Sequence, residues 1–539
     1  MFTIQLHSYK RKVYKLAHLM QLRMSQKQNY VKSAPIIQKT TAIFLIISLL
    51  VGLLIGYFIG SATVGSAPAP APTPTGEVVP KSQYDELQKQ VESLKQQLQQ
   101  LSAQQGGKPV EIVITAWTQG PERESIYRHL NLVEAANRLN QIFQATGVPA
   151  TVKLEGDFST AQWTDYRKKV FLALEGGTGP CIFQMEHVWS ATLAENGWII
   201  PLDSYVKKYW NWTYYDIIPG LWNSVTYKGH IWGIPQDTEA RPIFFNKLLL
   251  KKLGWTDDQI NALPEKIKNG EFTLQDMLMV AKEAVDKGVV QPGYGIWHRP
   301  SAGPDWPIVY LAFGGTLYDD ASGKLVADMN VWKKVFDWYY LASMQQYKVI
   351  SDKITSLDFN RDVHPTVVSG KVLFWMGGIW HKAQWIGSFN LSEDMFWKMF
   401  GFALYPAGEK GLKPVTLSQP QAYFISKTCK YPEVAFLILT LATDPYLNSL
   451  HDVKSAHLAI LYSQLSSPVY TQDKFLAMTG YMVEYAKYQP MHPRWGDYNT
   501  IIFNTIKGIE TGQLNSDQAL QVFEQNLRST LGDAIIIKK

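Results

Sequence analysis

Polar side chains follow two predicted strands at the points where those strands end, and their types suit the capture of a hydroxyl-rich ligand. Thr118 and Gln119 follow the first strand, and Glu186 and His187 end the third. Such groups donate and accept the hydrogen bonds that ligand hydroxyls require once both surfaces have lost water. Aromatic rings, which cover the apolar faces of sugars, are also abundant, with 18 Trp in the chain. The pattern indicates a binding cleft.

Chemistry that breaks bonds has little support in the sequence. Paired carboxylates and Trp-lined clefts also suit glycan hydrolysis, so a surface glycosidase is an alternative. The chain nevertheless has no G-x-S-x-G, H-E-x-x-H or phosphate-binding P-loop motif. We therefore expect a protein that is not an enzyme and needs no cofactor.

The elements that position these side chains alternate between strand and helix. Apolar, β-branched runs predict strands at 110–117, 150–155 and 180–185, with helices at 125–146 and 163–175 between them. This alternation is typical of an α/β fold with a parallel, doubly wound sheet. In such sheets ligands bind at the carboxyl ends of the strands, where the polar residues lie.

Longer stretches of the chain resemble the extracellular solute-binding proteins of the maltose-binding type. The most specific is YKGHIWGIPQDTEARPIFFNKLLLKKLGW at 227–255, which keeps that family's order of turn, strand, polar hinge, second strand and helix. Four further stretches match in the family's order and spacing, at 270–288, 311–325, 367–385 and 401–411. The last is followed by SKTCKYPEVAFLILTLAT, which resembles the family's S-K-N-P-E-A-A region.

The resemblance implies a type II binding-protein fold, in which two α/β lobes close on a ligand about a hinge. It places the three hinge crossings near 237–241, 404–406 and 452–454. Lobe 1 would then comprise 109–237 and 405–452, and lobe 2 would comprise 242–403 and 455–539. The implied role is substrate capture for an ABC importer, with a sugar or oligosaccharide as ligand and the membrane permease subunits as partners.

The resemblance also implies which residues touch the ligand. Trp380 matches the aromatic wall of the family's sugar cleft, and Glu239 matches an acid that accepts hydroxyl hydrogens. A hinge ion pair with Arg241 is the alternative role for Glu239, and core packing is the alternative for each Trp. Together with the two strand ends, the candidates are Trp380, Glu239, Asp237, Glu186, His187, Trp306, Trp297, Trp495, Thr118 and Gln119.

Other ligands and roles are compatible with the sequence. A polyol phosphate would need a positive cleft, which Arg241, Arg299 and His298 could supply, and a peptide is a further alternative. A purely structural surface protein would need a repeat pattern, and the chain has none.

The positive charge of the chain is concentrated at its N-terminus. The formal net charge is +6, but residues 1–40 carry eight Lys or Arg and no acid, so the remainder is close to neutral. Nucleic-acid binding therefore has no electrostatic support. The apolar run at 41–60 is long enough to span a bilayer, and its one-sided basic flank predicts a cytoplasmic N-terminus and an extracellular body. A cleaved secretory signal is the alternative.

A linker and a stalk occupy 61–108. Pro alternates through SAPAPAPTPT, which favours an extended conformation. A short heptad seam follows, with Tyr84, Leu87, Val91, Leu94, Leu98 and Leu101 at a and d positions. Weak self-association through this coiled coil and a lone solvated helix are both open.

Three smaller features bear on the compartment. The two cysteines, Cys181 and Cys429, lie far apart in sequence, and we expect two separate buried thiols although an outside location permits a bond. Asn211-Trp-Thr and Asn390-Leu-Ser are N-x-[ST] acceptors for glycosylation, a motif short enough to arise by chance.

Overall fold

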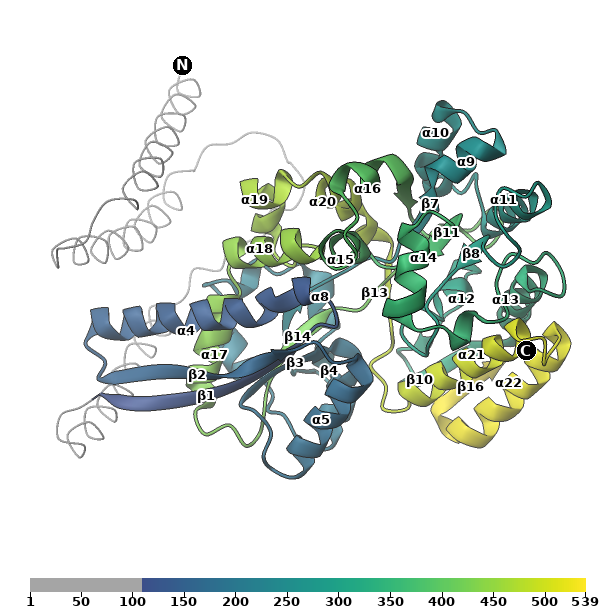
Figure 1. Ribbon diagram of the computed structural model, residues 1–539. Helices are drawn as coiled ribbons and strands as arrows, with labels where there is room; N and C mark the ends of the chain where they lie inside the picture. Colours follow the sequence, from purple (N-terminus) through teal and green to yellow (C-terminus); the bar gives the residue numbers. More distant parts are fainter. Residues whose placement is uncertain (1–108) are drawn as a thin grey trace, which may run out of the picture. The chain divides into compact units, whose positions relative to one another are not determined.

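Residues 109–539 are described by a computed structural model, which forms an α/β body with two principal sheets (Figure 1). The predicted basic tail, membrane anchor, Pro-rich linker and heptad stalk all lie outside the described residues. Within residues 109–539, none of the helices combines the length and the apolar character needed to cross a membrane.

The first sheet has the strand order β2-β1-β3-β14-β6. Its strands are β1 (Val110–Gln119), β2 (Ala150–Ser159), β3 (Ile182–Glu186), β14 (Gln421–Ile425) and β6 (Ile234–Asp237). β1 runs parallel to β2 and β3, which confirms the parallel arrangement predicted for the first three strands. The expectation of a fully parallel sheet was wrong, because β14 runs antiparallel to both β3 and β6.

Helices cover both faces of this sheet. On one face α4 (Tyr127–Thr146) and α17 (Pro432–Ala442) pack against Ile112, Ile114 and Ile182. On the other face α5 (Trp163–Glu175) packs against Phe183 and Phe424. Successive strand residues point to opposite faces, so Ile182 of β3 packs in one core while Phe183 and Met185 pack in the other.

The second sheet has the order β12-β7-β11-β8 and forms the centre of lobe 2. Its strands are β12 (Phe400–Ala403), β7 (Ile243–Asn246), β11 (Phe374–Met376) and β8 (Ile296–Trp297). β7 runs directly into α9 (Lys247–Leu253). The side chain of Asn246 caps this helix by accepting the N–H groups of Leu248 and Leu249, and Gly254 ends it in the left-handed conformation. This local chemistry explains the F-N-K…L-G pattern of the sequence.

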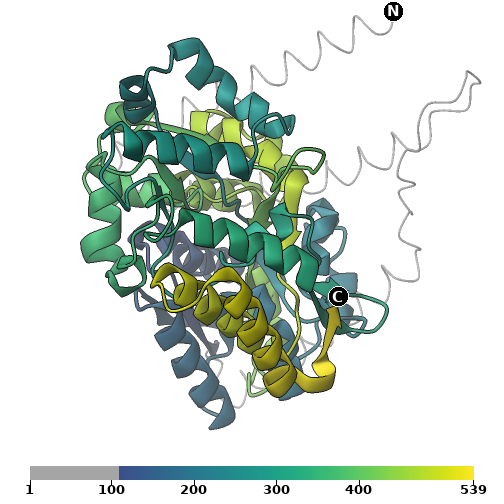
Figure 2. The ribbon, with the colours of Figure 1, turned by 90° about the vertical axis from the view of Figure 1, so that its right-hand side faces the viewer.

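Further helices and a small sheet complete lobe 2. Capping boxes begin α10 (Asp257–Lys268) and α11 (Leu274–Asp286). The helices α13 (Met329–Ala342), α21 (Trp495–Glu510) and α22 (Ser516–Leu531) pack together at the C-terminal end (Figure 2). Beside them lies the small sheet β16-β10-β9, built from Ile535–Lys538, Lys324–Asp328 and Tyr318–Asp319.

The chain passes from the first sheet to the second between β6 and β7, through residues 238–242. Thr238 pairs there with Leu458, so two passages between the lobes lie side by side. A short pair of strands, β13 (Thr416–Ser418) and β15 (Ala486–Tyr488), lies next to them, and the Ser418 hydroxyl is hydrogen-bonded to that of Thr238. The exact limits of the two lobes stay a prediction.

Cys181 and Cys429 form a disulfide, so the expectation of two separate thiols was wrong. Cys181 directly precedes β3, and Cys429 lies in the turn after the neighbouring strand β14. The antiparallel pairing of Ile182 with Ile425 brings the two segments together, although 248 positions separate the cysteines in sequence. Their proximity depends on this strand pairing, which spacing alone does not reveal.

Candidate ligand-binding site

The hinge passage after β6 carries a buried ion pair. Glu239 and Arg241 are both almost fully buried, and their side chains contact one another directly. The amide N–H of Arg241 donates to the hydroxyl of Thr416, 2.7 Å away, and its guanidinium donates to the carbonyl of Leu417 and the amide oxygen of Gln419. The ion pair that was the alternative for Glu239 is therefore present.

Trp380 lies over this ion pair. The guanidinium carbon of Arg241 is 5.1 Å from the centre of the Trp380 ring, within the range of a cation–π contact. The imidazole of His457 is roughly parallel to the same ring, with centroids 6.2 Å apart. Trp380 is half-buried and directly precedes α15 (His381–Gly387). An aromatic face thus meets the charged residues of the hinge.

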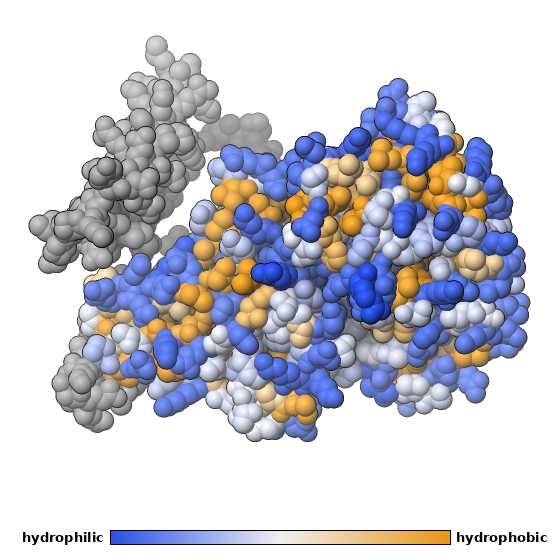
Figure 3. Space-filling model, viewed as in Figure 1, coloured by the Kyte–Doolittle hydropathy of each residue, from blue (hydrophilic) through white to orange (hydrophobic). Residues whose placement is uncertain are grey.

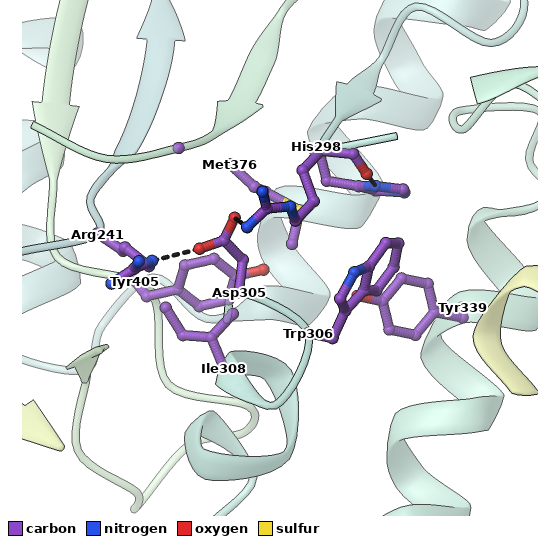
Figure 4. Close-up of a pocket in the computed structure, with 10 residues that line it drawn as sticks. Arg241, His298, Asp305, Trp306, Ile308, Tyr339, Met376 and Tyr405 are labelled. Atoms are coloured by element: carbon purple, nitrogen blue, oxygen red, sulfur yellow. Dashed lines mark hydrogen bonds and ion pairs between the residues drawn. The ribbon is translucent and has the colours of Figure 1, made fainter. Parts of the chain in front are cut away.

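Asp305 lies between two guanidinium groups. It forms an ion pair with Arg241, drawn in Figure 4, and a second with Arg299, whose Nη1 lies 3.2 Å from Oδ2. Burial alone would raise the pKa of Asp305, but the charges of Arg299 and Arg241 outweigh it and hold the pKa below its usual value. Asp305 is therefore ionised and shares its charge between two cations.

His298 and Trp306 form the lobe 2 wall of the same pocket (Figure 4). His298 Nε2 lies 2.7 Å from the carboxylate of Glu510, and its Nδ1 lies 2.8 Å from the carbonyl of Arg299. Burial tends to lower the pKa of His298, yet Glu510 raises it above the ordinary value. The ring of Trp306 packs edge-on against His298, with centroids 4.8 Å apart, and its indole N–H donates to the carbonyl of Ser301.

These residues enclose a small cavity. Its volume of about 10 Å³ is close to the room that one water molecule needs. The lining residues are Arg241, His298, Arg299, Asp305, Trp306, Ile308, Tyr339, Met376, Gly377 and Tyr405. A sugar ring is far larger, so it enters this site only if the surrounding segments separate.

Glu239 is the titratable group of the site with the most perturbed acidity. Burial raises its pKa to about 8, against the opposing charge of Arg241, and the carboxylates of Asp237 and Asp305 raise it further. Glu239 therefore takes up a proton more readily than an ordinary carboxyl, and a protonated Glu239 could donate a hydrogen bond as well as accept one.

The predicted residues of lobe 1 lie at the end of β3. Glu186 accepts a hydrogen bond from the indole N–H of Trp189, 3.0 Å away, and burial raises its pKa. The imidazole of His187 lies 3.3 Å from the carbonyl of Gln489, on a segment that is joined to lobe 2 through Pro304. Burial lowers the pKa of His187 to about 4, so its ring is neutral. This strand end contacts lobe 2 directly.

Asp237 belongs to a separate buried cluster behind the pocket. Its carboxylate contacts the guanidinium of Arg128 at 2.9 Å and Nε2 of His451 at 2.8 Å. Asp237, His451 and His457 offer ligand atoms within 4.8 Å of one another, as a metal site would. Arg128, however, also approaches His457 Nε2 at 3.2 Å. Its guanidinium already supplies the positive charge that balances Asp237, so these residues do not call for a metal.

Four other predicted residues are engaged in internal contacts. The indole of Trp297 donates to the carbonyl of Gly293 within the core of lobe 2, and that of Trp495 donates to the side chain of Gln489. Thr118 and Gln119 are fully buried. The side-chain amide of Gln119 donates to the carbonyl of Ala161, and the main-chain carbonyl of Gln119 accepts from Arg128. Of the candidates, Trp306 lines the cavity, and Trp380 and Glu239 contact its lining residue Arg241.

Sequence reasoning missed several residues that build the site. Asp305 directly precedes the predicted Trp306, and a search for acids beside a proposed ligand aromatic would have found it. Arg128 and Tyr405 gave no such signal. Arg128 reaches the hinge from the first turns of α4, and only the packing of that helix against β6 and the segment around His451 brings it there.

Comparison with known proteins identifies the family of this chain. The profile of the bacterial extracellular solute-binding proteins matches residues 131–445, more than half of the chain. The chain therefore belongs to this family of solute-binding proteins, whose members are not enzymes. The resemblance found in the sequence is confirmed.

Solved structures share the two-lobed, maltose-binding-protein-like fold. The GacH receptor of Streptomyces glaucescens, solved unliganded and with acarbose, aligns with a TM-score of 0.61 and 16% identity over 79% of this chain and 100% of its own. A solute-binding protein of an ABC transporter from Thermotoga lettingae, solved with α-D-tagatose, gives 0.60 and 20% identity over 78% and 100%. Maltose-bound MalE3 of T. maritima gives 0.58 and 18% over 77% and 99%.

A curated relative is the maltotriose-binding protein of Pyrococcus abyssi. It is 21% identical over 313 residues, which cover 51% of this chain and 61% of the relative. The match thus spans less than two thirds of the relative's length.

Proposed function

We propose that this protein captures a sugar or oligosaccharide outside the cell and delivers it to the permease of an ABC importer. The ligand lies between the strand end at Glu186 and His187 on one lobe and the pocket of Trp380, Glu239 and Trp306 on the other. Membership of the solute-binding family supports the class of function, and the sugars named for the related structures support the class of ligand.

The pairing of charges in the pocket is the observation that favours a sugar over a phosphorylated ligand. Each cation that could attract a phosphate already faces a carboxylate: Arg241 faces Glu239 and Asp305, Arg299 faces Asp305, and His298 faces Glu510. Paired charges present fixed donors and acceptors without a large net field. This arrangement suits neutral hydroxyl groups, and the ring of Trp380 suits the apolar face of a sugar.

Binding would begin from an open form. The strand end at His187 already contacts Gln489, so we expect the lobes to separate about the passages near Thr238 and Leu458 before a sugar can reach Trp380 between them. The ligand then takes the place of the Arg241 guanidinium over Trp380, and the lobes close upon it. The permease then recognises the closed conformation of the binding protein. No step in this cycle makes or breaks a covalent bond.

The extracellular location follows from the family and is supported by the disulfide, a bond typical of oxidising compartments. We further propose that the apolar run 41–60 holds the body at the cell surface as a single span with a cytoplasmic N-terminus. The linker and stalk at 61–108 would keep the body away from the bilayer.

The test is thermal unfolding of residues 109–539 against mono- and oligosaccharides, peptides and phosphorylated polyols. A ligand at about a thousand times its Kd stabilises the folded form by roughly 4 kcal/mol, a shift of several degrees. We expect a shift with one class of sugar, clearly smaller in Trp380→Ala, with the sugar recovered unaltered. A shift with phosphorylated or peptide ligands alone would overturn the sugar assignment, and turnover of the sugar would overturn the transport role.

A further inference from the structure

An exposed aromatic group surrounds one asparagine on lobe 1. Trp210, Trp212 and Tyr215 are 41%, 53% and 59% exposed, in a turn between α7 (Asp203–Lys208) and α8 (Pro219–Asn223). The turn has a defined conformation, because the amide of Trp212 donates to the carbonyl of Tyr209 and that of Tyr215 donates to the carbonyl of Trp210. Asn211 is exposed and lies between the two tryptophans in the sequence.

Neighbouring elements extend this aromatic surface. The Ser463 amide donates to the carboxylate of Asp216, which places the half-exposed Tyr462 and Leu465 beside the turn. The Thr213 hydroxyl donates to the carbonyl of Thr443, 2.6 Å away, close to the half-exposed Tyr446. On the face drawn in Figure 3, hydrophilic residues separate several groups of apolar residues. A cluster of large rings left in water is unusual and marks a surface that something covers.

The two N-x-[ST] motifs differ in their surroundings. Asn211-Trp-Thr lies within the aromatic group. Asn390 adopts a left-handed backbone with φ 56° and lies just before α16 (Glu393–Met399), whose N-cap is Ser392. Leu391 is buried, so that motif offers no aromatic surface of its own. The sequence does not distinguish the two motifs, but the structure does.

We propose that Asn211 carries an N-linked oligosaccharide whose first sugar rings pack on Trp210, Trp212 and Tyr215. The donor class is an oligosaccharide bound through its C1 to a polyprenyl phosphate or diphosphate. The Asn211 side-chain nitrogen forms the new bond to C1 and loses one proton, while the bond from C1 to the phosphate oxygen breaks. The polyprenyl phosphate or polyprenyl diphosphate, according to the donor, leaves with the electron pair of that bond. The product is an N-glycosylated amide, and no oxidant or reductant is needed.

The aromatic rings explain why a glycan would be retained on this surface. The apolar faces of sugar rings stack on indole and phenol rings and exclude water from both. Thr213 adds a constraint on timing, because its hydroxyl is buried in the folded chain and bonded to Thr443. Transfer therefore precedes the folding of this turn. The proposal depends only on passage through the outer compartment, which the family and the disulfide support, and is independent of the transported solute.

The first test is mass spectrometry of the full chain isolated from its native cells. Trypsin cleaves after Lys208 and Lys228, so peptide 209–228 contains the Asn211 motif and not the Asn390 motif. Peptide 383–398 contains Asn390 and is the internal control. We expect peptide 209–228 to carry the mass of an oligosaccharide at Asn211. Recovery of that peptide only at its unmodified mass would overturn the proposal. Binding of free saccharides or membranes to the aromatic surface would not rescue it.

A second test asks whether the glycan packs on the indole rings or is only attached at Asn211. Asn211→Gln removes the glycan, and replacing Trp210 and Trp212 by Gln keeps the N-x-T motif intact. All variants are produced in the native cells and compared by thermal unfolding. Loss of the glycan should lower Tm by about 1–2 °C when the indoles are present and leave Tm unchanged when they are absent. An equal effect in both backgrounds would refute packing on the indoles.

Discussion

The guanidinium of Arg241 lies against the ring of Trp380, and this contact occupies the place where we propose that a sugar ring stacks. A planar cation covers an aromatic face and keeps the ring from water, as a stacked sugar ring would. Binding then exchanges one partner of the ring for another. The affinity for sugar is thus the difference between the two contacts.

Truncating Trp380 should abolish most of the sugar affinity. The variant Trp380→Ala loses the aromatic face, and we expect affinity to fall about 10- to 100-fold, corresponding to roughly 1.4–2.8 kcal/mol. Because Trp380 is half-buried, the fold should tolerate the change. Isothermal titration calorimetry with the sugar identified by thermal shift gives the affinity directly.

The control for this variant is Trp297→Phe. Trp297 lies in the core of lobe 2 and its indole donates to the carbonyl of Gly293, so the substitution removes a buried hydrogen bond. Stability should fall by about 1–2 kcal/mol with affinity unchanged. If Trp297→Phe weakened binding as much as Trp380→Ala, the assignment of Trp380 as the ligand wall would be wrong.

The acidity of Glu239 predicts a pH dependence of stability. Its pKa is about 8 in the folded chain and close to the ordinary value of 4.5 when unfolded, so the folded state holds the proton more tightly. This group therefore stabilises the fold fully below about pH 4.5, and its contribution declines as pH rises toward 8. The slope from one group cannot exceed about 1.4 kcal/mol per pH unit.

The measurement compares wild type with Glu239→Gln by urea unfolding from pH 5 to 9. Other buried acids, such as Glu186, also titrate, but they contribute to both proteins and cancel in the difference. The free energy of unfolding of wild type relative to the variant should fall with rising pH and level off above 8. A difference that stays constant over this range would show that Glu239 keeps an ordinary pKa.

Local patterns in the sequence predicted the elements well. The helix predicted at 163–175 agrees with α5 (Trp163–Glu175), and all three predicted strands begin within two residues of their observed starts. Trp380 and Glu239 were singled out because their stretches match family motifs, and their role in ligand binding stays a prediction. The predictions that failed concern contacts between residues that are far apart in the sequence. The disulfide needs β14 to lie antiparallel to β3, and Arg128 reaches Asp237 across 109 positions. No local pattern encodes such contacts.

The disulfide should contribute strongly to stability. It joins two segments 248 positions apart, and a cross-link over a long loop removes much entropy from the unfolded chain. The double variant Cys181→Ser/Cys429→Ser should lose about 2–5 kcal/mol of unfolding free energy. Calorimetry with and without a reductant checks this. Reductant should lower Tm of wild type toward that of the variant and leave the variant unchanged, and equal Tm values for both proteins would contradict the prediction.

A hydrogen bond between the lobes should tune affinity without touching the ligand. The hydroxyl of Ser388, at the end of α15, donates to the carboxylate of Glu124 on lobe 1, 3.0 Å away. Ser388→Ala removes one bond that exists only when the lobes meet, and should destabilise the closed form by about 1 kcal/mol. Sugar affinity should then fall up to about fivefold, because closure is part of binding.

The matched control is Ser356→Ala, which removes a hydroxyl that donates to the carbonyl of Lys353 within lobe 2. Small-angle scattering should show a larger radius of gyration for Ser388→Ala alone, and unchanged affinity and radius would mean that this contact does not hold the lobes together.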